Sequence, residues 1–400
     1  MSNTIVFIRR NKIFNDMVIR YSKDILGVND FTTISEYKNA NLYIDIKKYS
    51  ISDLTSYDWE NIEKALDINE VILKDRLLRN IEYIQAKYLV LVVSKYFIEL
   101  FKNKKYNNLI TYPVDNYVTD IMCKISRHYD IKVSGISNFF IQGYKRVTVY
   151  GEYNKIREVS EEEIDNVYDL LIKQFKSYMA SSFQKSLKNS VLYYFKFKIR
   201  YLYFYIFKYK ILNQLEYDYT STPYSATVDK INKFFPFKYF TNKVDDIDIK
   251  SIYIPMHYHP EATIEHWSDS IKNADYITSL IESVKYFSDN GWEVYLKEHP
   301  AMCFRQDIKL YKSLKNIYNV HILNPFLETS KIMEKFDNFL IWTGSTGLEA
   351  LINGKTVYFA SSNYYYEKKT NDKYEKVYLE TEIEKKELIK KVLTNTIKWK

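Results

Sequence analysis

Short apolar runs and longer segments with helical spacing alternate along the first part of the chain. The apolar runs at 5–8, 42–46 and 109–112 predict buried strands, and the spacing over 61–79 and 117–128 predicts helices. A further helix is predicted to start after Ser160. Ser160-Glu-Glu-Glu163 has the form of a capping box, in which the first and last side chains satisfy each other's backbone N–H groups.

The alternation becomes regular after residue 250. Strands are predicted at 252–256, 293–296, 320–323, 339–342 and 356–359, and helices at 266–287, 307–314, 327–336 and 347–352. A second capping box, Thr381-Glu-Ile-Glu384, opens the last predicted helix. Strands that alternate with helices through short loops predict βαβ units and a parallel sheet covered on both faces. The fold class predicted is therefore α/β.

The length of 400 residues is too great for one ordinary core and suits two. We predict an N-terminal α/β domain over 1–180, a helical connection over 181–245 and a C-terminal Rossmann-like domain over 246–400. The connection contains an aromatic and basic stretch, 191–212, in which Lys196, Arg200 and Lys210 share a helical face. This stretch either joins the domains through an aromatic interface or lies on an anionic membrane surface.

Composition narrows the classes of protein. The chain is 46% hydrophobic and 27% charged, with a formal net charge of +8. Because the positive excess is modest and Asp and Glu are interspersed throughout, we expect no nucleic-acid partner. Two cysteines, Cys123 and Cys303, cannot form a disulfide framework, which favours a reducing cytoplasm. We expect neither a signal peptide nor a transmembrane helix, since no apolar stretch is long enough.

Polar loops follow three of the predicted strands in the second half. They are His257-Tyr-His259-Pro-Glu261-Ala-Thr263, Lys297-Glu298-His299-Pro300 and Gly344-Ser345-Thr346-Gly347-Leu-Glu349-Ala350. Ligands of an open parallel sheet bind beyond the carboxyl ends of its strands, where these loops lie. The Gly-Ser-Thr-Gly turn offers backbone N–H groups, a hydroxyl and the positive end of a helix to a phosphate. Glu349 could accept hydrogen bonds from a ribose or serve as a capping charge.

Together the three loops favour a site that stabilises a phosphate leaving group electrostatically, with no metal and no cofactor. Lys297 supplies a cation, and Pro300 fixes the preceding His299. Two alternatives stay open. His257, His259 and His266 could bind zinc, or the histidines could simply satisfy backbone groups at the strand ends.

These loops resemble the capsule polysaccharide biosynthesis proteins, which are similar to bacterial 3-deoxy-manno-octulosonic acid (Kdo) transferases of capsule export systems. The resemblance rests on Ile254-Pro-Met-His257-Tyr-His259-Pro-Glu261-Ala-Thr263, Lys297-Glu-His-Pro300 and Thr343-Gly-Ser-Thr-Gly-Leu-Glu-Ala350 with Gly354-Lys355. It covers residues 250–360 and continues more faintly at 114–131 and in Arg146-Val-Thr-Val-Tyr150-Gly151-Glu152. One departure is His259, where the family more often has Gln.

The resemblance implies a GT-B glycosyltransferase, with two Rossmann-like domains facing across a cleft and the donor on the C-terminal one. By analogy with GT-B sialyltransferases, His299 and Ser345 would bind the phosphate of cytidine monophosphate (CMP). Lys297 would assist, and Glu349 would lie near the ribose. The donor-binding set implied is His257, Lys297, Glu298, His299, Pro300, Gly344, Ser345, Thr346, Gly347 and Glu349.

The function expected from this resemblance is transfer of a sugar from a nucleotide-sugar donor to a glycan or glycolipid acceptor of the bacterial surface or capsule. The sugar expected is a CMP-activated ulosonic acid, such as Kdo or a sialic-acid-like sugar. Carboxylates near predicted strand ends are candidate bases for the acceptor hydroxyl, although each could be a surface charge. They are Asp115, Asp120, Glu152 and Glu261.

Two other functions stay open. One is a phosphotransferase that uses CDP-glycerol or CDP-ribitol in polymer synthesis, and the other is a non-catalytic scaffold of the capsule machinery. We expect a cytoplasmic location. A peripheral position on the inner face of the cytoplasmic membrane, with the anionic lipid surface as a partner, is the alternative.

Overall fold

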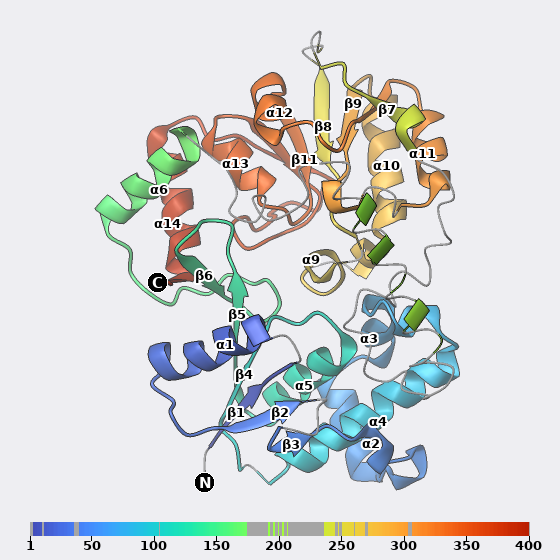
Figure 1. The fold of residues 1–400 in the computed structure, drawn as a ribbon, viewed down its shortest axis with the longest axis vertical. Helices are drawn as coiled ribbons and strands as arrows, with labels where there is room; N and C mark the ends of the chain where they lie inside the picture. Colours follow the sequence, from blue (N-terminus) through green and yellow to red (C-terminus); the bar gives the residue numbers. More distant parts are fainter. Residues whose placement is uncertain are drawn as a thin grey trace.

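The fold is known from a computed structural model (Figure 1). It describes residues 3–9, 12–35, 40–103, 105–173, 191–192, 195–196, 199, 202–203, 206, 236–244, 247, 250–259, 261–268, 271–302 and 306–399. Within these residues the strands form two sheets of seven, one built from strands of the first half and the last strand of the chain, the other from strands of the second half. Figure 1 shows the sheets in separate lobes, with helices packed around each.

The first sheet is mostly parallel and has the order β14-β6-β5-β4-β1-β2-β3. Its strands are β1 (Thr4–Phe7), β2 (Thr32–Ser35), β3 (Leu42–Tyr43), β4 (Asn108–Thr111), β5 (Lys132–Asn138), β6 (Tyr144–Val147) and β14 (Thr396–Lys398). Only β6 runs antiparallel to its neighbours β5 and β14 among the strand pairs described. The helices of this half are α1 (Lys12–Arg20), α2 (Ser56–Ala65), α3 (Ile68–Lys74), α4 (Tyr83–Phe101), α5 (Tyr117–His128) and α6 (Glu161–Lys173).

The second sheet has the order β13-β12-β11-β8-β9-β10-β7 and is parallel except for β13 at one edge. Its strands are β7 (Phe240–Thr241), β8 (Ser251–Pro255), β9 (Glu293–Lys297), β10 (Val320–Leu323), β11 (Asn338–Ile341), β12 (Thr356–Phe359) and β13 (Glu375–Val377). The helices are α9 (Ala262–Glu265), α10 (Tyr276–Asp289), α11 (Ile308–Lys315), α12 (Thr329–Lys335), α13 (Thr346–Ile352) and α14 (Glu382–Thr394).

Both faces of the second sheet are buried, as a doubly wound parallel sheet requires. Along β8, Ile252 and Ile254 join one hydrophobic cluster while Tyr253 joins the other. Along β11, Phe339 and Leu340 separate in the same way. Successive side chains of a strand point to opposite faces, so a strand that is apolar throughout needs a core on each side. The continuous apolar runs in the sequence reflect this geometry.

Several sequence predictions match the structure closely. The helix predicted at 117–128 is α5, and the strands predicted at 320–323 and 356–359 are β10 and β12. The second capping box is present, because the Thr381 N–H donates to Glu384 and the Glu384 N–H donates to the Thr381 hydroxyl. Ser160 also starts α6, where its hydroxyl accepts from the Glu163 N–H at 3.3 Å. The predicted α/β class with two Rossmann-like domains is confirmed.

Two long predicted helices are wrong. The segment 61–79 is divided between α2 and α3, because Leu66 is extended and Asp67 caps a new helix by accepting from the N–H groups of Asn69 and Glu70. The segment 266–287 is divided in the same way, since α10 starts only after Asp275. The strand predicted at 42–46 ends at Tyr43, where a short 3₁₀ turn follows.

The two halves exchange elements. Strand β14, from the end of the chain, pairs with β6 of the first sheet, and the sequence pattern did not predict β5, β6 or β14. Helix α6 buries Ile164, Val167 and Leu171 in the core of the second half, beside α14. The predicted boundaries near 180 and 245 fall at residues outside the described part, as do most of the 191–212 stretch and Cys303. The domain division therefore stays a prediction.

Candidate functional site

The second sheet reverses its winding direction at β8. From β8 the chain adds β9 and then β10 on one side, and it returns to place β11 and β12 on the other side. Loops that leave the carboxyl ends of β8 and β11 therefore diverge over the two faces of the sheet. Such a switch point leaves a crevice at the carboxyl edge, which is where ligands bind in this class of fold. The three polar loops predicted from the sequence follow β8, β9 and β11.

His257 follows β8 and lies against the loop that follows β11. Its ring centre is 6.3 Å from that of Trp342, and its backbone N–H donates to the Tyr276 hydroxyl at 3.0 Å. A Cβ atom at Gly344 would lie 3.3 Å from His257 Cε1, so glycine lets the two loops approach closely. Burial, together with His259 and His299 nearby, lowers the pKa of His257 to about 3. The imidazole is therefore neutral near pH 7.

The loop after β9 combines a buried cation with an exposed histidine. Lys297 is the last residue of β9 and is 7% exposed, and burial lowers the pKa of its ammonium group to about 8. The next side chain, Glu298, points inward, where the Tyr311 hydroxyl donates to it at 2.7 Å. His299 is exposed, and its ring centre is 5.8 Å from that of Tyr258 in the first loop. Pro300 begins a 3₁₀ turn that holds this loop at the edge of the sheet.

The loop after β11 turns sharply into α13. The Gly344 carbonyl accepts a hydrogen bond from the Tyr365 hydroxyl at 2.7 Å. Any side chain at Gly347 would collide with the same hydroxyl and with Ile341, so this glycine lets α13 pack tightly on its own strand. Thr346 is the first residue of α13. The turn thus holds the start of α13 beside the loop that contains His257.

Glu349 occupies the first turn of α13 and is buried. Its carboxyl accepts a hydrogen bond from the Ser345 hydroxyl at 3.2 Å. It is only 6% exposed, and burial raises its pKa to about 8. A neutral carboxyl does not repel an anion that approaches the adjoining loops.

Two of the four candidate bases use their carboxylate oxygens to bind neighbouring groups inside the protein. Asp120 is 1% exposed, accepts from the Tyr150 hydroxyl at 2.7 Å and pairs with Lys124 at 3.1 Å. Glu152 accepts from the backbone N–H groups of Val149 and Tyr150, as well as from the hydroxyl of Thr148. Because their oxygens hold α5 and a tight turn in place, neither carboxylate is arranged to take a proton from an acceptor.

The other two candidates lie where the domains meet. Asp115 follows β4 and forms a forked ion pair with Arg9, at 2.7 and 2.5 Å, while its side chain stays 33% exposed. The Arg9 charge holds the pKa of Asp115 below its usual value despite partial burial. Glu261 precedes α9 in the second domain and accepts from Thr263 at 2.9 Å. Burial raises the pKa of Glu261.

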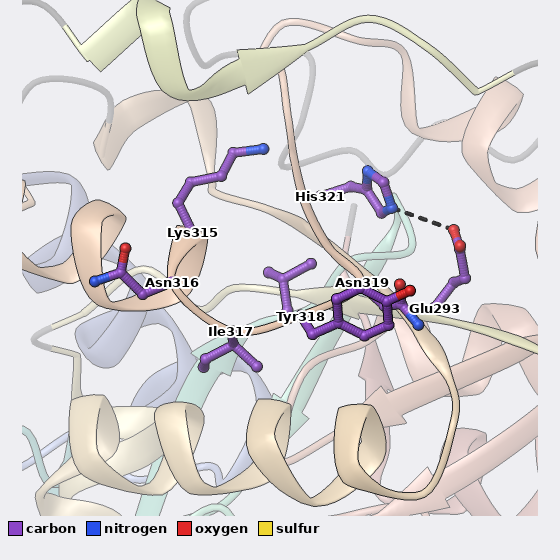
Figure 2. A pocket seen from close by; sticks show the side chains of 8 residues that line it. Glu293, Lys315, Asn316, Ile317, Tyr318, Asn319 and His321 are labelled. Atoms are coloured by element: carbon purple, nitrogen blue, oxygen red, sulfur yellow. Dashed lines mark ion pairs between the residues drawn. The ribbon is translucent and has the colours of Figure 1, made fainter.

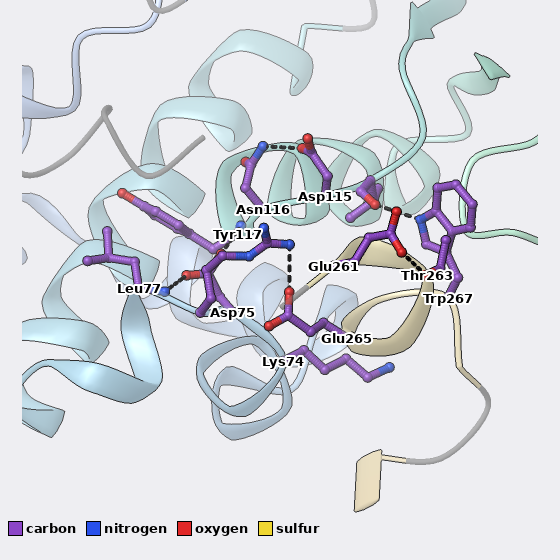
Figure 3. Close-up of polar contacts among 12 residues, drawn as sticks. Lys74, Asp75, Leu77, Asp115, Asn116, Tyr117, Glu261, Thr263, Glu265 and Trp267 are labelled. Carbon is purple, nitrogen blue, oxygen red and sulfur yellow. Dashed lines mark hydrogen bonds and ion pairs between the residues drawn. The ribbon is translucent and has the colours of Figure 1, made fainter. Parts of the chain in front are cut away.

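A charged cluster that the sequence did not predict joins the two domains (Figure 3). Glu265 of α9 is fully buried and pairs with Arg76 at 2.6 Å and Arg79 at 2.5 Å. Asp75 positions both arginines, since it accepts from backbone N–H groups of their own turn and from the Tyr117 N–H at 2.7 Å. The sequence signal for this cluster was the pair of arginines on either side of Leu77-Leu78. It could not reveal the partner, because Glu265 lies far along the chain.

These contacts show that the carboxyl edges of the two sheets face each other. The segment after β8 contains Glu265 and also Trp267, whose indole N–H donates at 2.7 Å to the Val114 carbonyl. Val114 lies just beyond the carboxyl end of β4. The crevice at β8 and β11 therefore opens toward the first domain.

A surface depression of about 490 Å³ lies at the opposite edge of the second sheet (Figure 2). It is lined by Glu293 and the loop 315–321, at the amino ends of β9 and β10. His321 lies 3.2 Å from Glu293 there. Because parallel sheets bind ligands at their carboxyl ends, this depression is not the candidate site.

The described residues contain neither a cluster of metal ligands nor a helix suited to span a membrane. In this part of the chain no group of three or more His, Cys, Asp or Glu side chains is placed to hold a metal ion, and His257, His259 and His266 do not form one. Among the same residues, no helix is both long and apolar enough to cross a membrane.

The fold defines a class: an α/β protein with two Rossmann-like domains in a GT-B-like arrangement. Similar solved structures include KpsC of Thermosulfurimonas dismutans, a β-Kdo 2,7-transferase, at 13% identity and a TM-score of 0.39, covering 98% of this chain and 90% of that one. The UDP-GlcNAc 2-epimerase of Methanocaldococcus jannaschii has 11% identity and a TM-score of 0.24, with 90% and 84% covered. These values are too low to support an argument about activity. No protein-family model and no curated sequence matches the chain.

Proposed function

We propose that this protein is a glycosyltransferase that uses a nucleotide-sugar donor. One observation supports the proposal above all others: the loops after β8, β9 and β11 meet at the switch point of the second sheet and face the first domain. This is the position at which a Rossmann-like domain holds a nucleotide. In this proposal the facing first domain would bind the second substrate.

In this proposal the donor phosphate binds between Lys297, His299 and the loop 344–347. Lys297 keeps its proton at neutral pH, because its pKa of about 8 is still above 7. An anion beside it would stabilise the charged form further. The backbone N–H groups at the start of α13 are further donors. The Ser345 hydroxyl would donate to the phosphate in place of its hydrogen bond to Glu349. Together these groups would stabilise the negative charge that develops on the departing phosphate.

The reaction proposed is a displacement at the anomeric carbon of the sugar. The acceptor hydroxyl oxygen bonds to that carbon, the bond from carbon to phosphate oxygen breaks, and the electron pair leaves with the nucleotide. The hydroxyl proton passes to a carboxylate on the interdomain face. Asp115 and Glu261 are the two remaining candidates for this base, because the carboxylates of Asp120 and Glu152 are engaged by groups of the interior. Glu261 suits the role better, because burial raises its pKa whereas Arg9 lowers that of Asp115, and a carboxylate of higher pKa is the stronger base.

The resemblance of the three loops to Kdo transferases supports a CMP-activated ulosonic acid as donor and a capsule or surface glycan as acceptor. We also propose that the protein works on the inner surface of the cytoplasmic membrane. Exposed apolar side chains recur every three or four residues in the 191–212 stretch, at Leu192, Phe195, Ile199, Leu202 and Ile206. An apolar stripe beside lysine and arginine is typical of a helix that lies on anionic lipid.

The proposal predicts that Lys297→Gln weakens CMP binding. Loss of one charge-assisted hydrogen bond to phosphate should lower affinity about tenfold to a hundredfold, measured by titration calorimetry. Lys315→Gln is the matched control, because Lys315 lies on the same domain beside the depression at the opposite edge of the sheet. Equal CMP affinity for the parent and Lys297→Gln, with the fold intact by circular dichroism, would contradict the phosphate site.

Activity assays separate the proposal from its rivals. Transfer or donor hydrolysis with CMP-Kdo or CMP-sialic acid supports a glycosyltransferase, whereas turnover of CDP-glycerol alone supports the phosphotransferase. Glu261→Gln should reduce kcat and abolish the acidic limb of the pH profile if Glu261 is the base, because a base is active only when it is deprotonated. Asp115→Asn tests the other candidate. A scaffold would bind its partners normally with His299→Ala and show no turnover in the parent.

A further inference from the structure

Arg146 of β6 lies buried between the two domains. It belongs to the first sheet, where it pairs with Ser137 of β5 and Thr396 of β14. It is 5% exposed, and its guanidinium carbon lies 4.2 Å from the ring centre of Tyr364 and 5.3 Å from that of Trp267. Both rings come from the second domain. The guanidinium is therefore held between aromatic faces at the place where the domains meet.

Among the residues that the structure describes, this cation has no anionic partner at contact distance. Its Nε and Nη2 atoms are buried without a hydrogen bond, and Arg146 forms no ion pair with any residue that the structure describes. The carboxylate of Glu152 acts on it only from a distance, because that group is engaged by Thr148 and by backbone N–H groups. Burial lowers the pKa of Arg146 to about 10, which still leaves it charged near pH 7.

An unpaired buried charge is costly, and removing one commonly leaves a protein as stable or more stable. The aromatic faces recover a part of this cost. The Nε and Nη2 groups of a guanidinium lie in one plane, and both are without a hydrogen bond here. Such a pair can donate two parallel hydrogen bonds to the two oxygens of a carboxylate or phosphate. The arrangement is thus prepared for an anion that comes from outside the chain.

Arg146 also faces the candidate site. Tyr364 adjoins Tyr365, whose hydroxyl binds the Gly344 carbonyl of the loop after β11. Glu349 of α13 influences Tyr364 electrostatically, as Arg146 does. Arg146 and Glu349 therefore both lie near Tyr364. The first domain contributes its cation to the wall that faces the proposed donor loops.

We infer that Arg146 binds an oxyanion of the substrate, either the carboxylate of an acidic sugar or a phosphate oxygen of the nucleotide. Access requires Tyr364 to move, since the Trp267 indole is fixed by its bond to Val114 and by its contact with Gly151. The Tyr364 ring is 7% exposed and packs against Phe139 and Tyr365, so a bound anion has to displace a packed ring. This inference rests on the proposed function only in taking the substrate to be anionic.

The test uses Arg146→Met, which keeps the length and removes the charge, and Arg146→Lys, which keeps the charge and loses the planar fork. The probes are free Kdo, which has a carboxylate and no phosphate, inorganic phosphate, which has no carboxylate, and N-acetylglucosamine, which is neutral. Arg20→Met is the control, because Arg20 is exposed on α1 and pairs with Asp24. Affinities are measured by ligand-observed NMR titration, and Tm by calorimetry.

We expect Arg146→Met to keep or raise Tm while it loses about tenfold to a hundredfold in affinity for one of the two anions. Arg146→Lys should recover part of the loss. Loss for Kdo identifies the carboxylate as the bound group, and loss for phosphate identifies the nucleotide. Unchanged affinity for both anions, with a lowered Tm, would overturn the inference and leave Arg146 as a structural bridge.

The two proposals fail in different ways. If CMP affinity does not depend on Lys297, the proposed donor site is wrong, whatever Arg146 does. If Lys297→Gln weakens CMP binding and Arg146→Met changes neither anion, the donor site stands and the role of Arg146 is refuted.

Discussion

The buried carboxyl of Glu349 makes the stability of this protein depend on pH in a direction that a single variant can test. Burial raises its pKa from the ordinary 4.5 to about 8. Below pH 4.5 the group is protonated in the folded and unfolded states alike and costs nothing. Between pH 4.5 and 8 the unfolded chain ionises it freely while the folded chain does not. Stability is therefore present at low pH and is lost as pH rises through this window.

The size of the effect follows from the two pKa values. Each pH unit between them costs about 1.4 kcal/mol, so the charge penalty reaches about 4 kcal/mol at pH 8 and stays below about 1 kcal/mol at pH 5. Glu349→Gln has the same shape, cannot ionise and can still accept the hydrogen bond from Ser345. The variant should therefore be more stable than the parent by about 4 kcal/mol at pH 8, and by less than about 1 kcal/mol at pH 5.

Urea denaturation at pH 5 and pH 8 measures the free energy of unfolding of both proteins. Glu387→Gln is the matched control, since Glu387 is exposed on α14 and its replacement should change stability equally at both pH values. If Glu349→Gln changes the free energy of unfolding by the same amount at pH 5 and pH 8, Glu349 is not held neutral in the folded protein. The argument that it avoids repelling an anionic donor would then fail with it.

Two further predictions concern the domain contact and the membrane. Glu265→Gln leaves Arg76 and Arg79 without a buried anionic partner. It should therefore lower the free energy of unfolding, measured by urea denaturation, by about 3–5 kcal/mol. A decrease below about 1 kcal/mol would show that water replaces the carboxylate. Replacement of Lys196, Arg200 and Lys210 by Gln should reduce sedimentation with anionic liposomes but leave binding to neutral liposomes unchanged. Sedimentation equal to that of the parent would exclude the membrane proposal.

The sequence determined those elements whose signals are local. Short runs rich in apolar and β-branched residues between polar turns predict strands, and β10 and β12 were predicted with their observed bounds for that reason. Capping boxes depend on residues three positions apart, so the starts of α6 and α14 were also predicted correctly. The order of strands and helices then placed the three polar loops at one edge of the sheet, because the carboxyl ends of parallel strands share that edge.

The tertiary structure decided what depends on residues far apart in the chain. No local pattern pairs Arg79 with Glu265, which is 186 positions away, or places the last strand in the first sheet. Nor does the sequence say which carboxylate is free to act: Asp120 and Asp115 look alike in the chain, but one is buried against Lys124 and the other stays partly exposed. Arg146 is the clearest case. Whether Arg146 has an anionic partner depends on every element packed around it, and only the folded molecule brings those elements together. Among the described residues it packs against two aromatic rings and has no such partner.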